Sequence, residues 1–213
     1  MFFSEAFGKW QTYEHRGTHL DAPYHFSKNG RRLQDLTIED LNGPLVIVDI
    51  SAKAAQPGDI AMLEVSDLQE WEARNGRIQN HAFVIMSSGW EKFWGDNDKY
   101  FGDGAPRFPG FSKDAVEWLL ANRQIYGIGT DTLSCESSRN LYEVHTTILP
   151  AGKVCIENLR NLDKIPPCGA RFMALPIKLK DGTGSQTRAF AEWEDGWGFQ
   201  SSCNINLPHY HDY

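Results

Sequence analysis

The sequence predicts an α/β domain built around a mixed sheet. Nearly continuous apolar runs of strand length, such as 45–50 and 81–86, outnumber the helical patterns between them. Such runs are typical of strands buried on both faces. A chain of 213 residues is long enough to bury a sizeable core, and we expect one domain spanning 1–213 with a tail at 195–213.

The first half of the chain carries local signals for four elements. Thr37 caps a short helical turn over 37–41, and the apolar run 45–50 is a strand. Ser66 opens a capping-box pattern, so a helix is predicted from there to Asn75, where Gly76 ends it. The run 81–86 is the next buried strand.

The second half continues the alternation. Residues 96–109 contain several Gly, Pro and Asp, which favours a loop. Ser112 caps a predicted helix over 113–122. Strands are then expected at 125–130 and 154–159, either side of a short helix over 141–149. The last expected strands are 172–179, placed at an edge or bulge because it contains Pro176, and 187–193.

Charge and hydropathy exclude several classes of protein. The formal net charge is −7, and Arg31-Arg32 is the only adjacent basic pair that stands out. Nucleic acid and anionic membrane surfaces are therefore not expected partners. No stretch approaches the roughly 18 apolar residues of a membrane span. The first residues do not resemble a signal peptide, which favours a cytoplasmic location, or a secreted one if a leader has been lost.

The four cysteines form no Cys-x-x-Cys pair, so a zinc ribbon or a thioredoxin-like site is not expected. Their even number permits disulfides. We expect them instead to be buried, reduced thiols. They are Cys135, Cys155, Cys168 and Cys203.

The segment 13–26 holds three of the seven histidines and a carboxylate. On an extended strand, side chains alternate between faces, so the odd-numbered His15, His19, Asp21 and His25 would share one. Gly17 and Pro23 argue against a helix. We predict a strand running into a tight turn, with three imidazoles and a carboxylate directed to one point. Such donors suit Zn²⁺, Mn²⁺ or Fe²⁺.

A structural role for these histidines is the alternative. Histidines can also decorate an exposed strand or lie in a core with their hydrogen bonds satisfied. Four candidate ligands on one face within eleven residues, ending at a turn fixed by proline, favour a metal site over that alternative.

The pattern His-x-Gly-Thr-His-x-Asp-Ala-Pro-x-His, residues 15–25, resembles the signature of the metal-dependent cyclase hydrolase family, which includes bacterial-type kynurenine formamidase and isatin hydrolase. The Gly-x-Asp-Thr-x-Ser segment at 129–134 is also similar. The following residues 135–138 depart from the family's Asp-x-Gly. A second motif is found independently: His145, then Ile148-Leu149, then Ile-Glu-Asn-Leu at 156–159.

The resemblance implies a swivelling β/β/α fold whose sheet closes toward a barrel. It also implies that His145 and Glu157 complete the metal site with His15, His19 and Asp21, and that Asp21 can bridge if two ions bind. His25 is implied to be the general acid and base. Trp90 has two interpretations, a core residue or a wall of the substrate pocket, and we assign it to substrate binding.

The resemblance further implies a zinc- or manganese-dependent hydrolase of a small aryl amide or cyclic amide, with N-formylkynurenine as the first candidate substrate. An isatin-type lactam hydrolase and an inactive binding protein are the alternatives. Relatives carry a further N-terminal segment with a strand before the motif, and assemble as homodimers or larger homo-oligomers. These features are expectations for this chain.

Overall fold

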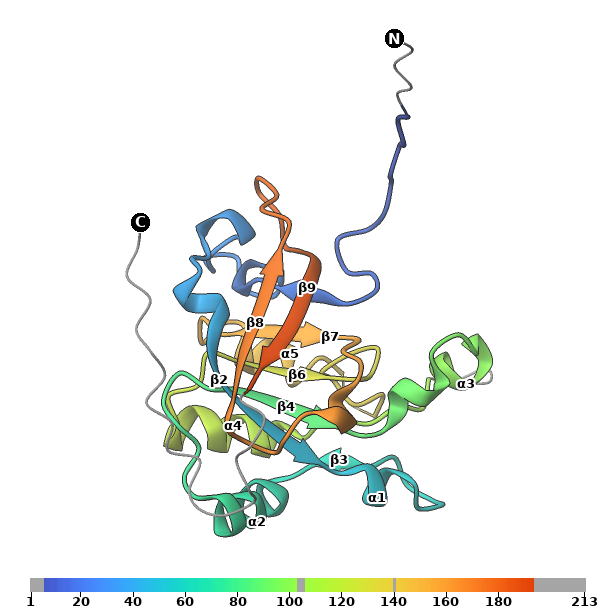
Figure 1. Ribbon diagram of the computed structural model, residues 1–213, viewed down its shortest axis with the longest axis vertical. Coiled ribbons are helices and arrows are strands. Elements are labelled where there is room, and N and C mark those ends of the chain that lie inside the picture. Colours follow the sequence, from blue (N-terminus) through green and yellow to red (C-terminus); the bar gives the residue numbers. More distant parts are fainter. Residues whose placement is uncertain (1–5, 103–105, 140, 194–213) are drawn as a thin grey trace.

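The computed structural model describes residues 6–102, 106–139 and 141–193, so the predicted tail at 195–213 lies outside the described residues. Seven of the described strands form a closed barrel in the order β1-β7-β6-β4-β2-β8-β9 (Figure 1). Their bounds are β1 His19–Asp21, β2 Asn42–Asp49, β4 Phe83–Ser87, β6 Gly127–Thr130, β7 Val154–Glu157, β8 Ala170–Pro176 and β9 Gly184–Glu192. The predicted mixed sheet is confirmed, and it closes as the family resemblance implied.

The remaining elements are short. The helices are α1 Ser51–Ala54, α2 Val65–Asn75, α3 Asn97–Phe101, α4 Lys113–Asn122 and α5 His145–Ile148. Five 3-10 turns are η1 Pro23–His25, η2 Leu33–Asp35, η3 Glu39–Leu41, η4 Trp90–Phe93 and η5 Leu162–Lys164. Two further strands, β3 Met62–Leu63 and β5 Gly110–Phe111, pair in parallel outside the barrel.

Strand direction divides the barrel into two parts. Strands β2, β4, β6 and β7 are parallel neighbours, so their carboxyl ends meet at one edge. Strands β8 and β9 form an antiparallel hairpin, and β8 is also antiparallel to β2. The three-residue strand β1 is antiparallel to both β7 and β9 and thereby closes the barrel.

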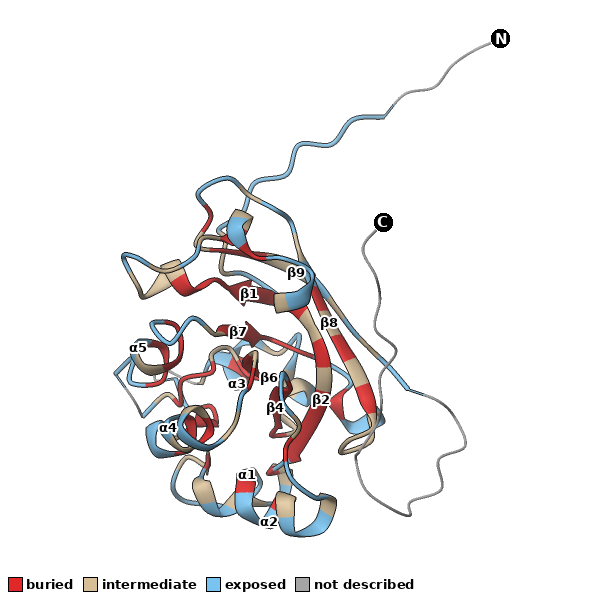
Figure 2. Cartoon of the chain, turned by 90° about the vertical axis from the view of Figure 1, so that its left-hand side faces the viewer, coloured by how far each residue is buried: buried red, intermediate tan, exposed pale blue. Residues whose placement is uncertain are grey.

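Alternate residues of the strands feed two separate cores. One set, including Leu20, Ile85, Ile156 and Phe172, fills the barrel interior. The other set lies on the outer face and packs with apolar side chains of α2, α4 and α5. Figure 2 shows these helices along one side of the barrel and the β8–β9 hairpin along the other. The period of two predicted from the apolar runs therefore separates interior from outer face.

The glycines of β6 make room for the interior side chains. A Cβ atom on Gly129 would lie 2.6 Å from Cδ1 of Ile85 and 2.9 Å from the carbonyl oxygen of Ile156. A Cβ atom on Gly127 would lie 2.6 Å from the carbonyl oxygen of Val154. Side chains from the neighbouring strands therefore occupy the space that β6 leaves in the small barrel.

Several local predictions need correction. Helix α4 has the predicted bounds, but α2 is capped by Glu64, paired with Asp67, rather than by Ser66. The predicted loop 96–109 contains α3, and the helix predicted over 141–149 shortens to α5. Strand β8 lies between β2 and β9, not at an edge. Pro176 is tolerated because it is the last residue of β8, beyond the stretch that pairs with β2.

The cysteines divide between two states. Cys135 and Cys155 are free and buried, as predicted. Cys168 is disulfide-bonded, so the prediction of a reduced thiol is wrong for that residue. Among the described helices, none has the length and apolar character needed to cross a membrane.

Candidate metal centre

The pairing of β1 with β7 brings the two sequence motifs together. His19 lies opposite Glu157, and Asp21 lies opposite Cys155. Because neighbouring side chains alternate between faces, His19 and Asp21 share the outer face while Leu20 points into the barrel. The extended-strand prediction thus holds for this pair, and the strand register explains why residues 138 positions apart in sequence meet.

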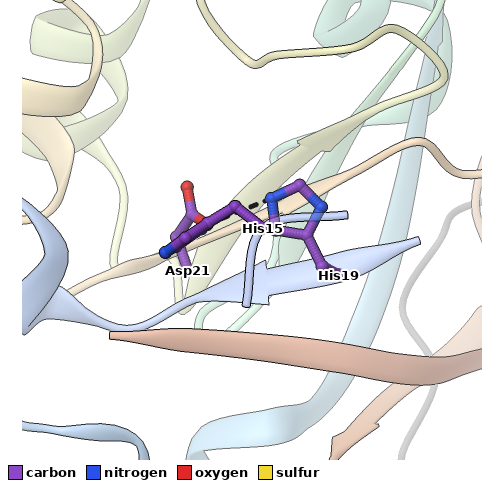
Figure 3. A group of neighbouring side chains, drawn as sticks. All are labelled: His15, His19 and Asp21. Carbon is purple, nitrogen blue, oxygen red and sulfur yellow. Dashed lines mark hydrogen bonds and ion pairs between the residues drawn. The ribbon is translucent and has the colours of Figure 1, made fainter. Parts of the chain in front are cut away.

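His15 reaches the same point by a different route from the one predicted. Gly17 has φ +63° and the segment before His19 is bent, so His15 is not part of the strand. Its ring turns back, and Nδ1 lies 2.6 Å from Oδ1 of Asp21 (Figure 3). On the other side of the ring, Nε2 lies 2.8 Å from Oγ1 of Thr183. The Thr183 hydroxyl donates in turn to Glu14, so the ring is held from both sides.

His145, the first residue of α5, completes the cluster. Its Nε2 atom lies 3.4 Å from Oδ2 of Asp21 and 3.2 Å from Oε1 of Glu157. Its Nδ1 atom lies 3.2 Å from Oε1 of Glu136. Glu157 also accepts a hydrogen bond from the backbone N–H of Cys135 at 2.8 Å. Each of these ionisable side chains is buried.

The ring of His19 has a free nitrogen that faces two carboxylates. Nδ1 donates to the carbonyl oxygen of Gly17 at 2.9 Å, which leaves Nε2 with its lone pair in the neutral ring. Nε2 lies 3.3 Å from Asp21 and 3.3 Å from Glu157. It is buried and makes no hydrogen bond to any described residue. A lone pair facing two carboxylates is unfavourable unless a proton or a metal ion lies between them.

The pKa shifts also indicate that this cluster is stable only when it holds positive charge. Burial lowers the pKa of His19, but Asp21 and Glu157 outweigh it and raise the pKa to about 10. Burial is likewise outweighed at His145, whose pKa rises to about 12 beside Asp21, Glu136 and Glu157. Burial opposes ionisation of Asp21, yet its histidine partners hold its pKa well below the ordinary value. Without a metal ion, protons must supply the charge.

The donor set fits a divalent cation. One ligand atom from each of His15, His19 and Asp21 lies within 4.8 Å of the others, a group that can hold a metal ion (Figure 3). Glu157 and His145 adjoin it through the contacts above. The other four predicted ligands therefore gather around Asp21, and the roles of all five as ligands stay a prediction.

The predicted catalytic residue lies beside this group. His25, in η1 beyond the Pro23 turn, stacks on the His15 ring with centroids 3.9 Å apart. Its ring centroid is 6.2 Å from that of His145. His25 is half-buried, and burial lowers its pKa from the ordinary value of 6.5. A neutral imidazole is thus held at the rim of the cluster.

Trp90 lies further from the cluster. It follows the carboxyl end of β4 in η4, where its backbone N–H donates to Asp131 at 2.7 Å. Its Nε1 atom donates to the carbonyl oxygen of Tyr100 at 3.1 Å. The Tyr100 hydroxyl donates at 2.6 Å to Asn158, which follows Glu157. Trp90 is therefore connected to the cluster through two residues, and its role in substrate binding stays a prediction.

Sequence reasoning missed two residues that orient the predicted ligands. Thr183 and Glu136 lie outside the matched motifs, and Glu136 falls in the loop that departs from the family pattern. The Glu136 carboxylate accepts from the backbone N–H of Val144 at 2.9 Å and also fixes the His145 ring. The one signal in the sequence was that residues 135–138 depart from the family pattern, and this signal did not indicate what Glu136 would contact.

Replacing Glu136 by Gln is expected to weaken Zn²⁺ binding about 10- to 100-fold, because such partners of ligating histidines fix the ring and raise its basicity. Competition titration against a chromophoric chelator measures the affinity. Glu143→Gln is the matched control, since Glu143 is exposed and lies two residues before α5. Equal affinities for both variants would show that Glu136 only caps the helix.

Comparisons with known proteins show which family this chain resembles. The Cyclase family model matches residues 2–137. The isatin hydrolase of Roseibium aggregatum is 33% identical over 189 residues, covering 84% of this chain and 71% of the relative. The kynurenine formamidase of Erythrobacter litoralis is 26% identical over 183 residues, covering 85% and 74%.

A solved structure gives the same result for the fold. Isatin hydrolase A from Ralstonia solanacearum superposes with a TM-score of 0.80 at 33% identity, over 85% of this chain and 73% of that chain. A family model that spans more than half of the sequence, a relative of this identity and a matching barrel lead to one conclusion. The chain belongs to the Cyclase family.

Proposed function

We propose that the protein is a metal-dependent hydrolase that cleaves the C–N bond of a small aryl amide or cyclic amide. The observation that carries the proposal is the cluster around Asp21: three imidazoles and two carboxylates, all buried except the partly exposed His15, with the free Nε2 atom of His19 directed between the carboxylates. Such a set has a clear use as a ligand shell and a high energetic cost without a cation.

The ligand shell that we propose consists of His15, His19, Asp21, His145 and Glu157, for one or two Zn²⁺ or Mn²⁺ ions. Asp21 bridges if two ions bind, since its two oxygens face different imidazoles. When bound, the metal supplies a Lewis acid that lowers the pKa of water from 15.7 to about 7.

His25 is proposed to move the proton. It is half-buried beside His15, and its lowered pKa leaves the ring neutral at pH 7. A neutral imidazole can accept a proton from the attacking water and return it to the leaving nitrogen.

An aromatic substrate is supported by the rings around this site. Phe26 stacks obliquely near His145, with centroids 5.0 Å apart, and also contacts Tyr142 at 5.4 Å. Tyr142 is exposed, so a planar ligand can reach these rings from solvent. We therefore propose Phe26 and Tyr142, together with Trp90, as the wall against which the substrate ring packs.

N-formylkynurenine, an aryl formamide, is the first candidate substrate. Its amide nitrogen is bonded to an aromatic ring, so the scissile C–N bond would lie at the metal centre when the ring packs against this wall. An isatin-type lactam is the second candidate, and the 33% identity to an isatin hydrolase favours it. An inactive binding protein is the third, but the complete donor set on both motifs counts against it.

We further propose a homodimer or larger homo-oligomer and a cytoplasmic location, or a secreted one if a leader precedes the chain.

Elemental analysis of the purified protein, paired with hydrolysis assays, tests the proposal. After Zn²⁺ or Mn²⁺ loading, near-stoichiometric metal with turnover of N-formylkynurenine or isatin is expected, and the faster substrate selects the branch. Stoichiometric metal without turnover of either compound would refute both candidate substrates, keep the metal centre and direct the search to other amides or lactones. Absence of metal under every loading condition would refute the metal centre and favour the binding protein.

A further inference from the structure

Cys155 is the one residue of the outer face of β7 that the family motifs do not include and that still lies against the cluster. It stands directly opposite Asp21 in the β1–β7 ladder. Directly paired residues have their Cβ atoms about 4.5–5.5 Å apart and direct them to the same face. Its thiol is free and fully buried. The ladder therefore places sulfur at the base of the proposed metal centre.

Distances place this thiol among ligand atoms. One donor atom each from Asp21, His145 and Cys155 lies within 4.8 Å of the other two, and all three residues are buried. This is the second such group among the described residues, and it shares Asp21 with the group formed by His15 and His19. Two sets of donors therefore meet at one carboxylate, which is the arrangement required for two neighbouring ions.

A second observation indicates that a cation belongs here. The buried Nε2 atom of His19 has no hydrogen bond within the described chain and faces Asp21 and Glu157. Nε2 of His145 faces the same two carboxylates from the other side. Cys155 therefore borders a group of donors that needs a positive ion, whereas an ordinary buried cysteine has only apolar neighbours.

We propose that Cys155 is a thiolate ligand of a second metal ion, which it holds together with Asp21 and His145. On binding, the Sγ–metal bond forms and the thiol proton is released to solvent, with no change of oxidation state. The inference rests on the proposed metal centre and adds a sulfur ligand to it.

A sulfur donor changes which metal the second position prefers. Thiolates are soft ligands that select Zn²⁺, whereas carboxylates and water suit Mn²⁺. A centre in which His15, His19 and Asp21 hold one ion and Cys155 helps to hold the other would bind Zn²⁺ strongly at both positions. Mn²⁺ would bind well only at the first. The affinities of the two positions should therefore be similar for Zn²⁺ and differ for Mn²⁺.

Co²⁺ substitution tests the sulfur ligand without measuring activity. Protein stripped with a chelator is titrated with Co²⁺, and absorption is followed through the near ultraviolet, where thiolate-to-Co²⁺ charge transfer appears, and through the visible. The wild type is expected to develop the charge-transfer band at the second equivalent. Cys155→Ala is expected to lose this band. It is also expected to bind the second equivalent of Zn²⁺ about 100-fold more weakly, since the loss of a residue that only orients a ligand already weakens metal binding about 10- to 100-fold.

Cys135→Ala is the matched control. Cys135 is equally buried and free, and its thiol neighbours that of Cys155 and faces the carbonyl oxygen of Ile156 at 3.9 Å, but it belongs to neither group of donor atoms. It should therefore keep the band and the affinity. Cys155→Ser is a second variant that retains a polar atom at the position, and it should also lose the band while a circular dichroism spectrum reports its fold.

The outcomes separate the two proposals. Visible Co²⁺ bands without the near-ultraviolet band in the wild type would overturn the role of Cys155 and leave the histidine–carboxylate centre in place. A band that survives in Cys155→Ala would overturn it equally. Failure to bind Co²⁺ at all would overturn both the sulfur ligand and the metal centre.

Discussion

Replacing Asp21 by Asn is expected to abolish both metal binding and turnover. Asp21 contacts His15, His19 and His145, so the change removes the one carboxylate among the described residues that is shared by all three imidazoles. A catalytic metal contributes several kcal/mol, and each 1.4 kcal/mol is a factor of ten, so the rate should fall at least about 1,000-fold. Elemental analysis and single-turnover assays with the faster substrate measure the two effects.

Loss of folding must be separated from loss of metal in this variant. Removing one partner of a buried ion pair costs about 3–5 kcal/mol, so chelated Asp21→Asn should unfold at lower urea than the chelated wild type. His15→Ala provides the milder variant, because His15 is partly exposed at the edge of the cluster. It should lose metal with a smaller effect on unfolding.

Asp181→Asn, which alters an exposed carboxylate, is the control for both measurements. Equal metal content in Asp21→Asn and in this control would contradict the bridging role of Asp21.

Replacing His25 by Ala is expected to lower kcat about 10²- to 10⁴-fold while the metal content stays unchanged, because a positioned acid–base group contributes a factor of that size. His25 stacks on His15 but lies outside the three-residue donor groups. Elemental analysis alongside kinetics distinguishes the roles. Loss of metal from His25→Ala would make His25 a ligand instead of the proton carrier.

The pH profile supplies a second readout for His25. Burial lowers its pKa, and the neutral ring is the active base, so kcat/KM should rise with pH and the midpoint of that rise should lie below the ordinary value of 6.5. In His25→Gln this acid limb should disappear. Tyr24→Phe, which changes the preceding side chain, should retain the wild-type limb.

The sequence predicted the buried strands because apolar runs such as Leu45–Ile50 are bounded by clear turn signals. It could not predict barrel closure, because closure depends on how β1, a predicted strand of only three paired residues, pairs with both β7 and β9. The family resemblance supplied that closure. Register between β1 and β7 is likewise a long-range property, so the meeting of Asp21 with Cys155 was beyond local reasoning.

The candidate ligands were predicted for partly incorrect reasons. The period-of-two argument is right for His19 and Asp21 and wrong for His15 and His25, because Gly17 and Pro23 redirect the chain on either side of β1. The supporting residue Glu136 was missed, since a side chain that orients another leaves no periodic signal. Its role follows only from the placement of α5 against the loop that precedes it.

Strand β1 joins barrel closure to the chemistry, because the same three residues carry His19 and Asp21 and bridge β7 to β9. A one-residue slip of β1 would exchange faces and direct Leu20 toward the cluster. If this seam opens, β7 and β9 become unprotected strand edges, which are templates for pairing with other chains. An ion held by His19 and Asp21 in the proposed metal centre would therefore keep β1 in register and protect the protein against edge-to-edge aggregation as well as sustain its chemistry.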